Sequence, residues 1–316
     1  MQRINRVEKA LRHEEGDRVP KCELVIEKEL VQEFTGNLNP GSREKIALLE
    51  HLNLDAVCLS PGEVDSAQEG YKDSGDSYPE ELIEKYLDSP RTFSEFEEFN
   101  RATDFFVFAL IDGSIGELIR FWGFENLMKA LFREPQRVER MQRMLSQGHY
   151  QLAENAIAKG AKGVIIGDDI AYQGGPFISP EMMQKKFFPF WKREAESIRN
   201  MGVPVLLHSE GNLFSLLPDL AAIYDGLHSL EPASHMSLKE VKKDYGGCLC
   251  LMGNLDLGYL YPGSKLEDLR SAVKKAMEEA KDGGGYIFGT CGGLWAGVSL
   301  EKVEAMSRFA EEYGKY

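Results

Sequence analysis

Eight short runs of apolar and β-branched residues alternate along the chain with segments of helical periodicity, and this alternation constrains the fold more than any other feature. Each run has the length and composition of a buried strand. The runs are PKCELVIE from Pro20, AVCLS from Ala56, FFVFALI from Phe105, GVIIGDD from Gly163, PVLLHSE from Pro204, DGLHSLE from Asp225, CLCLMGN from Cys248 and YIFGTC from Tyr286. Eight strand and helix units predict an α/β fold, a closed (β/α)8 TIM barrel.

An open, doubly wound sheet is the alternative architecture. It would usually carry a glycine-rich phosphate loop after the first strand, and the sequence around Glu27 has none. The 316 residues fit one barrel of about 250 residues with insertions. We expect two insertions on the catalytic face, Pro61 to Ser89 and the helical stretch Ile115 to Lys159. No Pro, Ser or Gly linker divides the chain, so we predict one domain over residues 1–316.

Charge and composition exclude several classes of function. The formal net charge of −14 would repel a phosphate backbone, so nucleic acid is not an expected partner. No apolar run is long enough to span a bilayer, and Met1 to Arg18 lacks a secretory signal, so we expect a cytoplasmic protein without a membrane anchor. The five cysteines are scattered. We expect four of them to be core residues and set Cys291 apart.

Polar residues gather where the predicted strands end. They are Glu27, Ser60, Asp112, Asp168 with Asp169, His208 with Glu210, Glu231, Asn254 with Asp256, and Cys291. The carboxyl ends of barrel strands carry the catalytic residues, so this ring predicts the active site. The alternative for Ser60, Asp112 and Asp256 is that they cap helices, because serine and aspartate favour helix starts.

His208 and Glu210 are two residues apart at a strand end, so their side chains point the same way. Gly211 permits a sharp turn after them, and Cys291 reaches the same end of the barrel within the segment GTCGG. Nitrogen, carboxylate and thiolate donors suit Zn²⁺, and three protein ligands describe a catalytic zinc site. The alternatives are a structural histidine and a cysteine that fills a tight turn.

The segment GDDIAYQGGP places two adjacent carboxylates before a polar loop that contains Tyr172. Adjacent side chains on a strand diverge, so only one carboxylate can face the barrel axis. We expect this to be Asp168 rather than Asp169. Trp122, Trp295 and Phe177 are either the aromatic wall of a pocket or packing residues.

Five motifs together resemble the uroporphyrinogen decarboxylase superfamily: GDDIAYQGGPFISPEMM, PVLLHSEGN, LHSLEP, LMGNLDLG and GGGYIFGTCGG. The resemblance runs over nearly the whole chain and is better to the cobalamin-dependent methyltransferases. In that branch, enzymes acting on coenzyme M bind zinc through an H-x-C pair and a late cysteine, which align with His208, Glu210 and Cys291. The middle ligand differs here. The arginine-rich segment by which the decarboxylases hold substrate carboxylates has no counterpart in DRVPKCELVIEKE.

The resemblance implies a zinc enzyme that exchanges a methyl group with a separate corrinoid (cobalamin) protein. A carboxylate in place of a thiolate hardens the ligand set and favours an oxygen ligand, so we expect a small-molecule methyl donor of the aromatic O-methyl type. We assign candidate catalytic roles to Asp168, Glu231 and Tyr172, cofactor binding to Asn254 and Asp256, and metal ligation to His208, Glu210 and Cys291. The alternatives are methylation of a thiol, a metal-free lyase of the decarboxylase type and a non-catalytic binding barrel. A homodimer is one of the assemblies that we consider.

Overall fold

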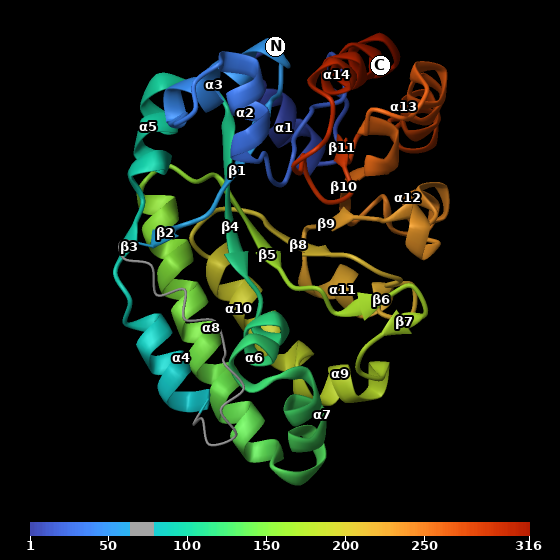
Figure 1. The fold of residues 1–316 in the computed structure, drawn as a ribbon. Helices are drawn as coiled ribbons and strands as arrows, with labels where there is room; N and C mark the ends of the chain where they lie inside the picture. Colours follow the sequence, from blue (N-terminus) through green and yellow to red (C-terminus); the bar gives the residue numbers. More distant parts are fainter. Residues whose placement is uncertain (64–78) are drawn as a thin grey trace.

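The computed structural model describes residues 1–63 and 79–316. Seven parallel strands form one sheet in the order β1-β4-β5-β8-β9-β10-β11 (Figure 1). Their bounds are β1 Ala56–Leu59, β4 Phe106–Asp112, β5 Gly163–Gly167, β8 Val205–Ser209, β9 Gly226–Ser229, β10 Cys250–Leu255 and β11 Tyr286–Thr290. These strands coincide with seven of the eight predicted runs, so the predicted α/β barrel architecture is confirmed.

The first predicted strand closes the barrel without forming a regular ladder. Lys21 forms a parallel bridge with Phe288 of β11, and Ile26 forms another with Leu294. On the other side, the Lys21 carbonyl accepts hydrogen bonds from the backbone N–H groups of Asp55 and Ala56, at the start of β1. The segment therefore lies between the two edge strands of the sheet, although Pro20 has no N–H to contribute to a ladder.

Helices and short elements connect the strands. The helices are α1 Arg3–Leu11, α2 Lys28–Thr35, α3 Ser42–His51, α4 Pro79–Leu87, α5 Ser94–Ala102, α6 Ser114–Trp122, α7 Phe124–Arg133, α8 Pro135–Ala158, α9 Pro180–Lys186, α10 Phe188–Arg199, α11 Leu217–Ile223, α12 Leu238–Tyr245, α13 Leu266–Ala280 and α14 Leu300–Tyr313. The short elements are β2 Gly62–Glu63 paired with β3 Arg91–Thr92, β6 Ala171–Tyr172 paired with β7 Gly175–Pro176, and the 3₁₀ turns η1 Pro232–Ser234 and η2 Leu257–Leu260.

Two hydrophobic clusters follow from the alternation of side chains along the strands. The inner cluster fills the barrel and includes Phe106, Ile165, Leu206 and Met252, while Val7 and Ala10 of α1 pack against it at the amino-terminal end of the strands. The outer cluster lies between the strands and the surrounding helices and is built from the residues of opposite parity. Burying both faces of each strand explains the near-continuous apolar runs in the sequence.

The cysteine prediction is partly wrong. Cys22, Cys58 and Cys250 are buried as expected, but Cys248 is exposed, because it lies in the turn that connects α12 to β10 rather than in the strand. None of the five cysteines forms a disulfide. In the part of the chain that the structure describes, no helix has the length and apolar character needed to cross a membrane.

The expected helical insertion after β4 is present as α6, α7 and α8. The buried side chain of His149 on α8 holds this layer together: its Nε2 lies 2.7 Å from Glu117 Oε2 of α6, and its Nδ1 lies 3.2 Å from Glu194 Oε1 of α10. Burial alone would lower the pKa of His149, but the charges and hydrogen bonds of the two glutamates raise it well above its usual range. Of the other expected insertion, Pro61 to Ser89, residues 64–78 lie outside the described residues, and the remainder contains β2 and α4.

Candidate active site

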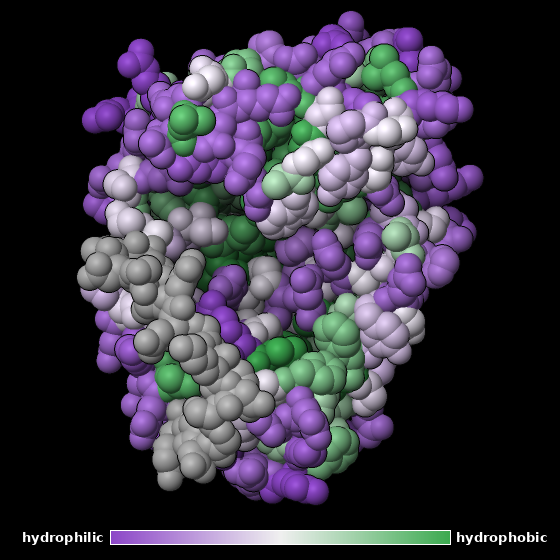
Figure 2. Space-filling view, viewed as in Figure 1, coloured by the Kyte–Doolittle hydropathy of each residue, from purple (hydrophilic) through white to green (hydrophobic). Residues whose placement is uncertain are grey.

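The carboxyl ends of the strands meet at one end of the barrel, which we call the mouth. Alternation along the strands directs His208 of β8 and His228 of β9 toward the interior, in line with Leu206 and Met252 of the inner cluster. Cys291 follows β11 directly, and its backbone N–H donates to the carbonyl of Leu255. The surface contains a hollow whose interior is hydrophobic and whose rim is largely polar (Figure 2).

His208 and His228 are register neighbours on adjacent strands, and their Nδ1 atoms lie 2.7 Å apart. The Nε2 atom of His228 lies 3.2 Å from the carbonyl oxygen of Thr290. A carbonyl only accepts, so the hydrogen-bond network assigns the proton of His228 to Nε2 and leaves its Nδ1 as an acceptor. His208 must then donate from Nδ1, and its Nε2 keeps an unprotonated lone pair.

The surroundings favour this neutral pair. Burial lowers the pKa of His208, and burial followed by the charge of His208 lowers that of His228 well below its usual value. Thr290 is itself fixed, because its hydroxyl donates to Glu23 Oε2 at 2.5 Å and its N–H donates to the same carboxylate at 3.1 Å. The Nε2 atom of His208, 3.9 Å from Asp169 Oδ1, is therefore ready to bind a cation or accept a proton.

His228 is a candidate site residue that the sequence analysis did not single out. It belongs to LHSLEP, which we used for a predicted strand, for Glu231 at the end of that strand and for the family resemblance. The sequence offered one signal, because the consecutive runs at Pro204 and Asp225 each contain one histidine. That the two histidines lie side by side and face inward became visible only with the register of the strands.

The structure reverses the expected orientations of Asp168 and Asp169. Asp168 is buried and points out of the barrel toward α6, where its carboxylate accepts from the N–H groups of Ile115 at 2.9 Å and Gly116 at 2.7 Å, in the first turn of that helix. Burial raises the pKa of Asp168 to about 7 despite these two donors. Asp169 lies beside His208 and accepts from the N–H of Glu210 at 2.8 Å. The prediction that Asp168 faces the site is wrong, because Ile165 and Gly167 occupy the inward parity of β5.

Glu210 and Cys291 approach each other across the mouth. A β-carbon placed on Gly292 would lie 3.1 Å from Glu210 Oε1, so the glutamate carboxylate lies over the turn that follows Cys291. Cys291 is 7 % exposed. Burial, followed by the negative charges of Asp256, Glu210 and Glu231, raises the pKa of its thiol to about 12. A cation at this point would favour the thiolate instead.

The donors at the mouth fit zinc in their chemistry, with an unprotonated imidazole nitrogen, a carboxylate and a thiol at the carboxyl ends of β8 and β11. The three side chains are not close enough together to coordinate one ion: within residues 1–63 and 79–316, no three His, Cys, Asp or Glu side chains have the geometry of a metal site. The hydrogen bond from Nδ1 of His208 to His228 is of the kind that orients a histidine ligand in zinc proteins.

The remaining predicted residues surround these donors. Glu231 accepts from the hydroxyl of Ser234 and, at 3.4 Å, from the N–H of Gly211. Asn254 donates from Nδ2 to the carbonyl of Leu230 at 3.1 Å. Asp256 caps η2 by accepting from the N–H of Gly258 at 2.7 Å, which confirms the helix-cap interpretation of that residue. Asp112 does not cap α6, whose N-cap is Gly113, and instead lies 3.6 Å from Arg120.

An aromatic wall, formed by Tyr172, Phe177 and Phe124, stands beside the mouth. Tyr172 and Phe177 are nearly parallel, with centroids 6.0 Å apart, and Phe124 meets Phe177 edge to face at 5.7 Å. Tyr172 is 57 % exposed, so its ring is free to contact a ligand. Of the tryptophans, Trp122 is buried packing and Trp295 is partly exposed, with Nε1 close to Gly292.

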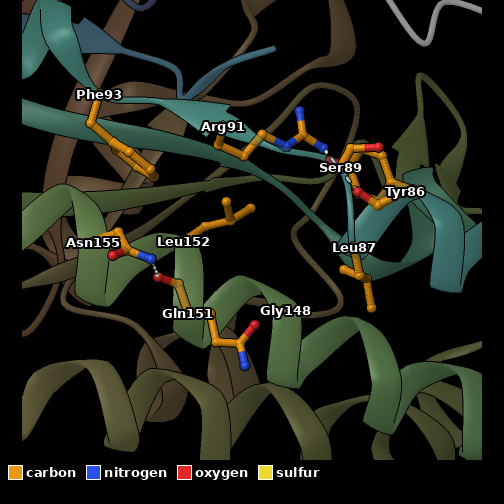
Figure 3. Close-up of a pocket in the computed structure, with 9 residues that line it drawn as sticks. All are labelled: Tyr86, Leu87, Ser89, Arg91, Phe93, Gly148, Gln151, Leu152 and Asn155. Carbon is orange, nitrogen blue, oxygen red and sulfur yellow. Dashed lines mark hydrogen bonds between the residues drawn. The ribbon is translucent and has the colours of Figure 1, made fainter. Parts of the chain in front are cut away.

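Cavities also occur outside the mouth. One of about 330 Å³ lies between α8 and the segment that joins α4 to β3, and Figure 3 shows Arg91, Gln151 and Asn155 among its lining residues. It contains none of the predicted site residues. A cavity of about 410 Å³ lies beside β10 and α13 and includes Asn254 and Asp256 in its lining. Part of the predicted ring therefore also faces a space next to the barrel mouth.

Comparison with known proteins adds family information to this geometry. The family model described as uroporphyrinogen decarboxylase (URO-D) matches residues 118–313. The uroporphyrinogen decarboxylase of Thioalkalivibrio sulfidiphilus is 25 % identical over 187 residues, which are 58 % of this chain and 51 % of that protein. That of Bacillus thuringiensis is 28 % identical over 130 residues, 40 % of this chain and 35 % of that one. The matched segment thus spans about half, or less, of the length of these curated relatives.

Solved structures show the same fold at low identity. A methyltransferase from Methanosarcina mazei has a TM-score of 0.76 at 18 % identity, covering 99 % of both chains. A B12-independent methionine synthase from Shewanella, in complex with selenomethionine, has a TM-score of 0.60 at 14 % identity, covering 93 % of this chain and 97 % of that chain. These similarities establish a shared barrel fold.

Proposed function

The chain belongs to the uroporphyrinogen decarboxylase family, and from this premise we propose that it is a methyltransferase of the family rather than a decarboxylase. It takes a methyl group from an aromatic O-methyl substrate and transfers it to Co(I) of a corrinoid carried by a partner protein. The observation that carries this proposal is the charge of the mouth, which suits a cation and opposes a substrate with many carboxylates.

Four carboxylates define this charge: Asp169, Glu210, Glu231 and Asp256. In the described part of the chain none of them forms an ion pair with a lysine or an arginine. Asp169, Glu231 and Asp256 accept hydrogen bonds from backbone N–H groups, and Glu231 also accepts one from a serine hydroxyl. Uroporphyrinogen carries several carboxylates, so this arrangement would repel it. The absence of an arginine-rich segment near Lys21 agrees with that argument.

We propose that zinc is held by His208, Glu210 and Cys291. The tautomer of His208 supports its role as a zinc ligand, because its Nε2 atom is unprotonated and its ring is oriented by His228. When bound, zinc would supply Lewis acidity at the ether oxygen. Asp169 and Glu231 would hold the backbone at Glu210 in place, since they accept hydrogen bonds from the N–H groups of Glu210 and Gly211, respectively.

The chemistry requires a positioned methyl ether. The bond between the methyl carbon and oxygen breaks with its electron pair left on oxygen, and the methyl carbon bonds to cobalt through the two electrons of Co(I). The aromatic ring of the substrate would pack against the exposed ring of Tyr172 beside the mouth. The opposite face of the Tyr172 ring would remain packed against Phe177. Holding the reacting carbon in line is the main contribution that such a wall can make.

The test uses the purified protein with Zn²⁺, reduced cobalamin and a methoxyarene, and follows the loss of Co(I) by its absorbance. We expect methylation of cobalt that depends on zinc. Release of carbon dioxide from uroporphyrinogen without a corrinoid would instead establish a decarboxylase. Demethylation of methyl-cobalamin by an added thiol, with no reaction of the ether, would establish the thiol-methylating alternative.

A further inference from the structure

We propose that the methyl donor carries a positive charge: an aromatic methyl ether with an ammonium group and without a carboxylate. The methyl ether in this inference comes from the proposed function. The positive charge is inferred separately, from the residues at the mouth. Two independent features of the described residues support it, the uncompensated carboxylates and the aromatic wall.

The carboxylates lie close enough to one another to act on the same ligand. Asp169 accepts from the N–H of Glu210 at 2.8 Å, and Glu231 accepts from the N–H of the next residue, Gly211, at 3.4 Å. A β-carbon placed on Gly292 would lie 3.1 Å from Glu210 Oε1, so the same carboxylate group also adjoins the turn after Cys291. A cluster of like charges with hydrogen bonds but no cationic partner is costly unless a ligand compensates for it.

Zinc alone would not balance this cluster. If Glu210 and the thiolate of Cys291 bind Zn²⁺, their two negative charges are matched by the two positive charges of the metal, and His208 contributes none. Asp169, Glu231 and Asp256 then remain as three net negative charges around the space left for the substrate. A donor with a carboxylate would be repelled by them, whereas an ammonium group would be attracted.

Two basic residues of the described chain, Lys275 and Arg120, contact acidic residues other than these carboxylates. Lys275 lines the cavity that includes Asp256, but its ammonium lies 3.9 Å from Glu279 of its own helix. On the β4 side, Arg120 lies 3.6 Å from Asp112 and stacks over the ring of Tyr86 at 4.6 Å. Neither pairs with the carboxylates around Cys291.

The aromatic wall adjoins these carboxylates through the backbone. The carbonyl of Tyr172 accepts from the N–H of Asn212 at 3.0 Å, and Gly211, the preceding residue, donates to Glu231. Gln173 donates from Nε2 to the carbonyl of Ala233 at 2.8 Å, which joins the β6–β7 hairpin to η1 beside Glu231. An aromatic ring next to a carboxylate is an arrangement that binds ammonium groups, through cation–π attraction together with ionic attraction.

Binding of three probes of nearly equal shape tests the charge directly. The probes are 3-methoxybenzylamine, 3-methoxybenzyl alcohol and 3-methoxybenzoate, titrated calorimetrically into the full chain with and without added Zn²⁺ at pH 7. We expect the amine to bind at least tenfold more tightly than the benzoate, with the alcohol between them. The preference should shrink as salt is raised, because salt screens exposed charges. Equal binding, or tighter binding of the benzoate, would overturn the inference.

Charge-neutral variants locate the effect. Asp169→Asn and Glu231→Gln each keep an oxygen acceptor for their backbone donors, and each should reduce the preference for the amine severalfold. Glu8→Gln on α1, at the opposite end of the barrel, removes the same charge and should leave the preference unchanged. A preference that survives in the double variant of Asp169 and Glu231 would contradict the assignment.

Cobalt methylation separates this inference from the proposed function. If the amine binds best and no methyl group reaches cobalt, the methyltransferase proposal fails and the charge assignment stands. If the benzoate is both bound best and demethylated, the charge assignment fails and the methyltransferase proposal stands.

Discussion

The Nδ1 atom of His228 accepts the Nδ1 proton of His208 across 2.7 Å, and this contact determines which nitrogen of His208 faces the barrel mouth. The direction is set by the carbonyl of Thr290, which takes the Nε2 proton of His228. A second histidine therefore performs the orienting role that carboxylates or backbone carbonyls more often have beside metal ligands. This partner adds no negative charge beside His208, and burial lowers the pKa of the His208 imidazole.

Replacement of His228 by leucine should weaken zinc binding by roughly ten- to a hundredfold, as changes to orienting partners typically do. The imidazole of His208 would lose its acceptor and be free to present either tautomer. The measurement is competition for Zn²⁺ with a chromogenic chelator, with circular dichroism as the control for folding. An unchanged zinc affinity in a folded variant would show that His228 does not orient the ligand.

Cys291→Ala tests the proposed ligand set. Wild-type protein should contain about one zinc per chain, and the variant should lose most of it while the thermal midpoint of the metal-free protein stays close to that of the wild type. Cys248→Ala is the matched control, because Cys248 is exposed and remote from the mouth. Full retention of zinc by Cys291→Ala would remove this residue from the ligand set.

Asp168 and Asp169 should respond differently to the same amide substitution. Asp168→Asn loses one acceptor for the N–H groups of Ile115 and Gly116, so the free energy of unfolding should fall by about 1–2 kcal/mol. Asp169→Asn should change the stability little and act on ligand binding at the mouth. Urea unfolding of both variants checks the difference. A larger loss of stability in Asp169→Asn would contradict the orientations described above.

The strand positions were predictable because each strand is buried on both faces and therefore reads as a continuous apolar run. The same feature concealed which strand residues face inward: in GVIIGDD no polar alternation marks the parity, so Asp168 and Asp169 could not be told apart. Gly167, whose inward position follows from Ile165, was the informative neighbour. Cys248 was assigned to the core for the same reason, since the apolar run began before the strand did.

Site residues that lie close together in the sequence could be predicted to share a site, whereas contacts that depend on the register between two strands could not. His208 and Glu210 share a strand end, so their common direction follows from a two-residue period. The pairing of His208 with His228 depends on β8 and β9 being adjacent in the correct register, which composition alone does not specify. The buried group of His149, Glu117 and Glu194 joins three helices far apart in sequence, and no local pattern indicated it.

This buried group predicts a pH dependence of stability. The two glutamates raise the pKa of His149 well above its usual value, so the folded protein keeps the proton at pH values where the unfolded chain releases it, near pH 6.5. Above that pH the folded state binds more protons than the unfolded state, and stability falls as pH rises. The contribution of His149 is fully present below about pH 6.5 and disappears as the pH passes the pKa of the folded state.

His149→Gln removes the charge between the two glutamates, so that Glu194 loses its cation and Glu117 keeps only the guanidinium of Arg120, 4.0 Å from Oε1. Because one oxygen of each glutamate already lacks a hydrogen-bond partner, the variant should lose roughly 3–5 kcal/mol of unfolding free energy at pH 6. The loss should be smaller at pH 9, because the stabilisation that protonated His149 gives the wild type has already decreased at that pH. Urea unfolding of both proteins at pH 6, 7.5 and 9 measures the difference, and comparison at each pH cancels the titration of other groups. Parallel curves for the two proteins across this range would mean that His149 is neutral in the folded state and that its contacts with the glutamates are ordinary hydrogen bonds.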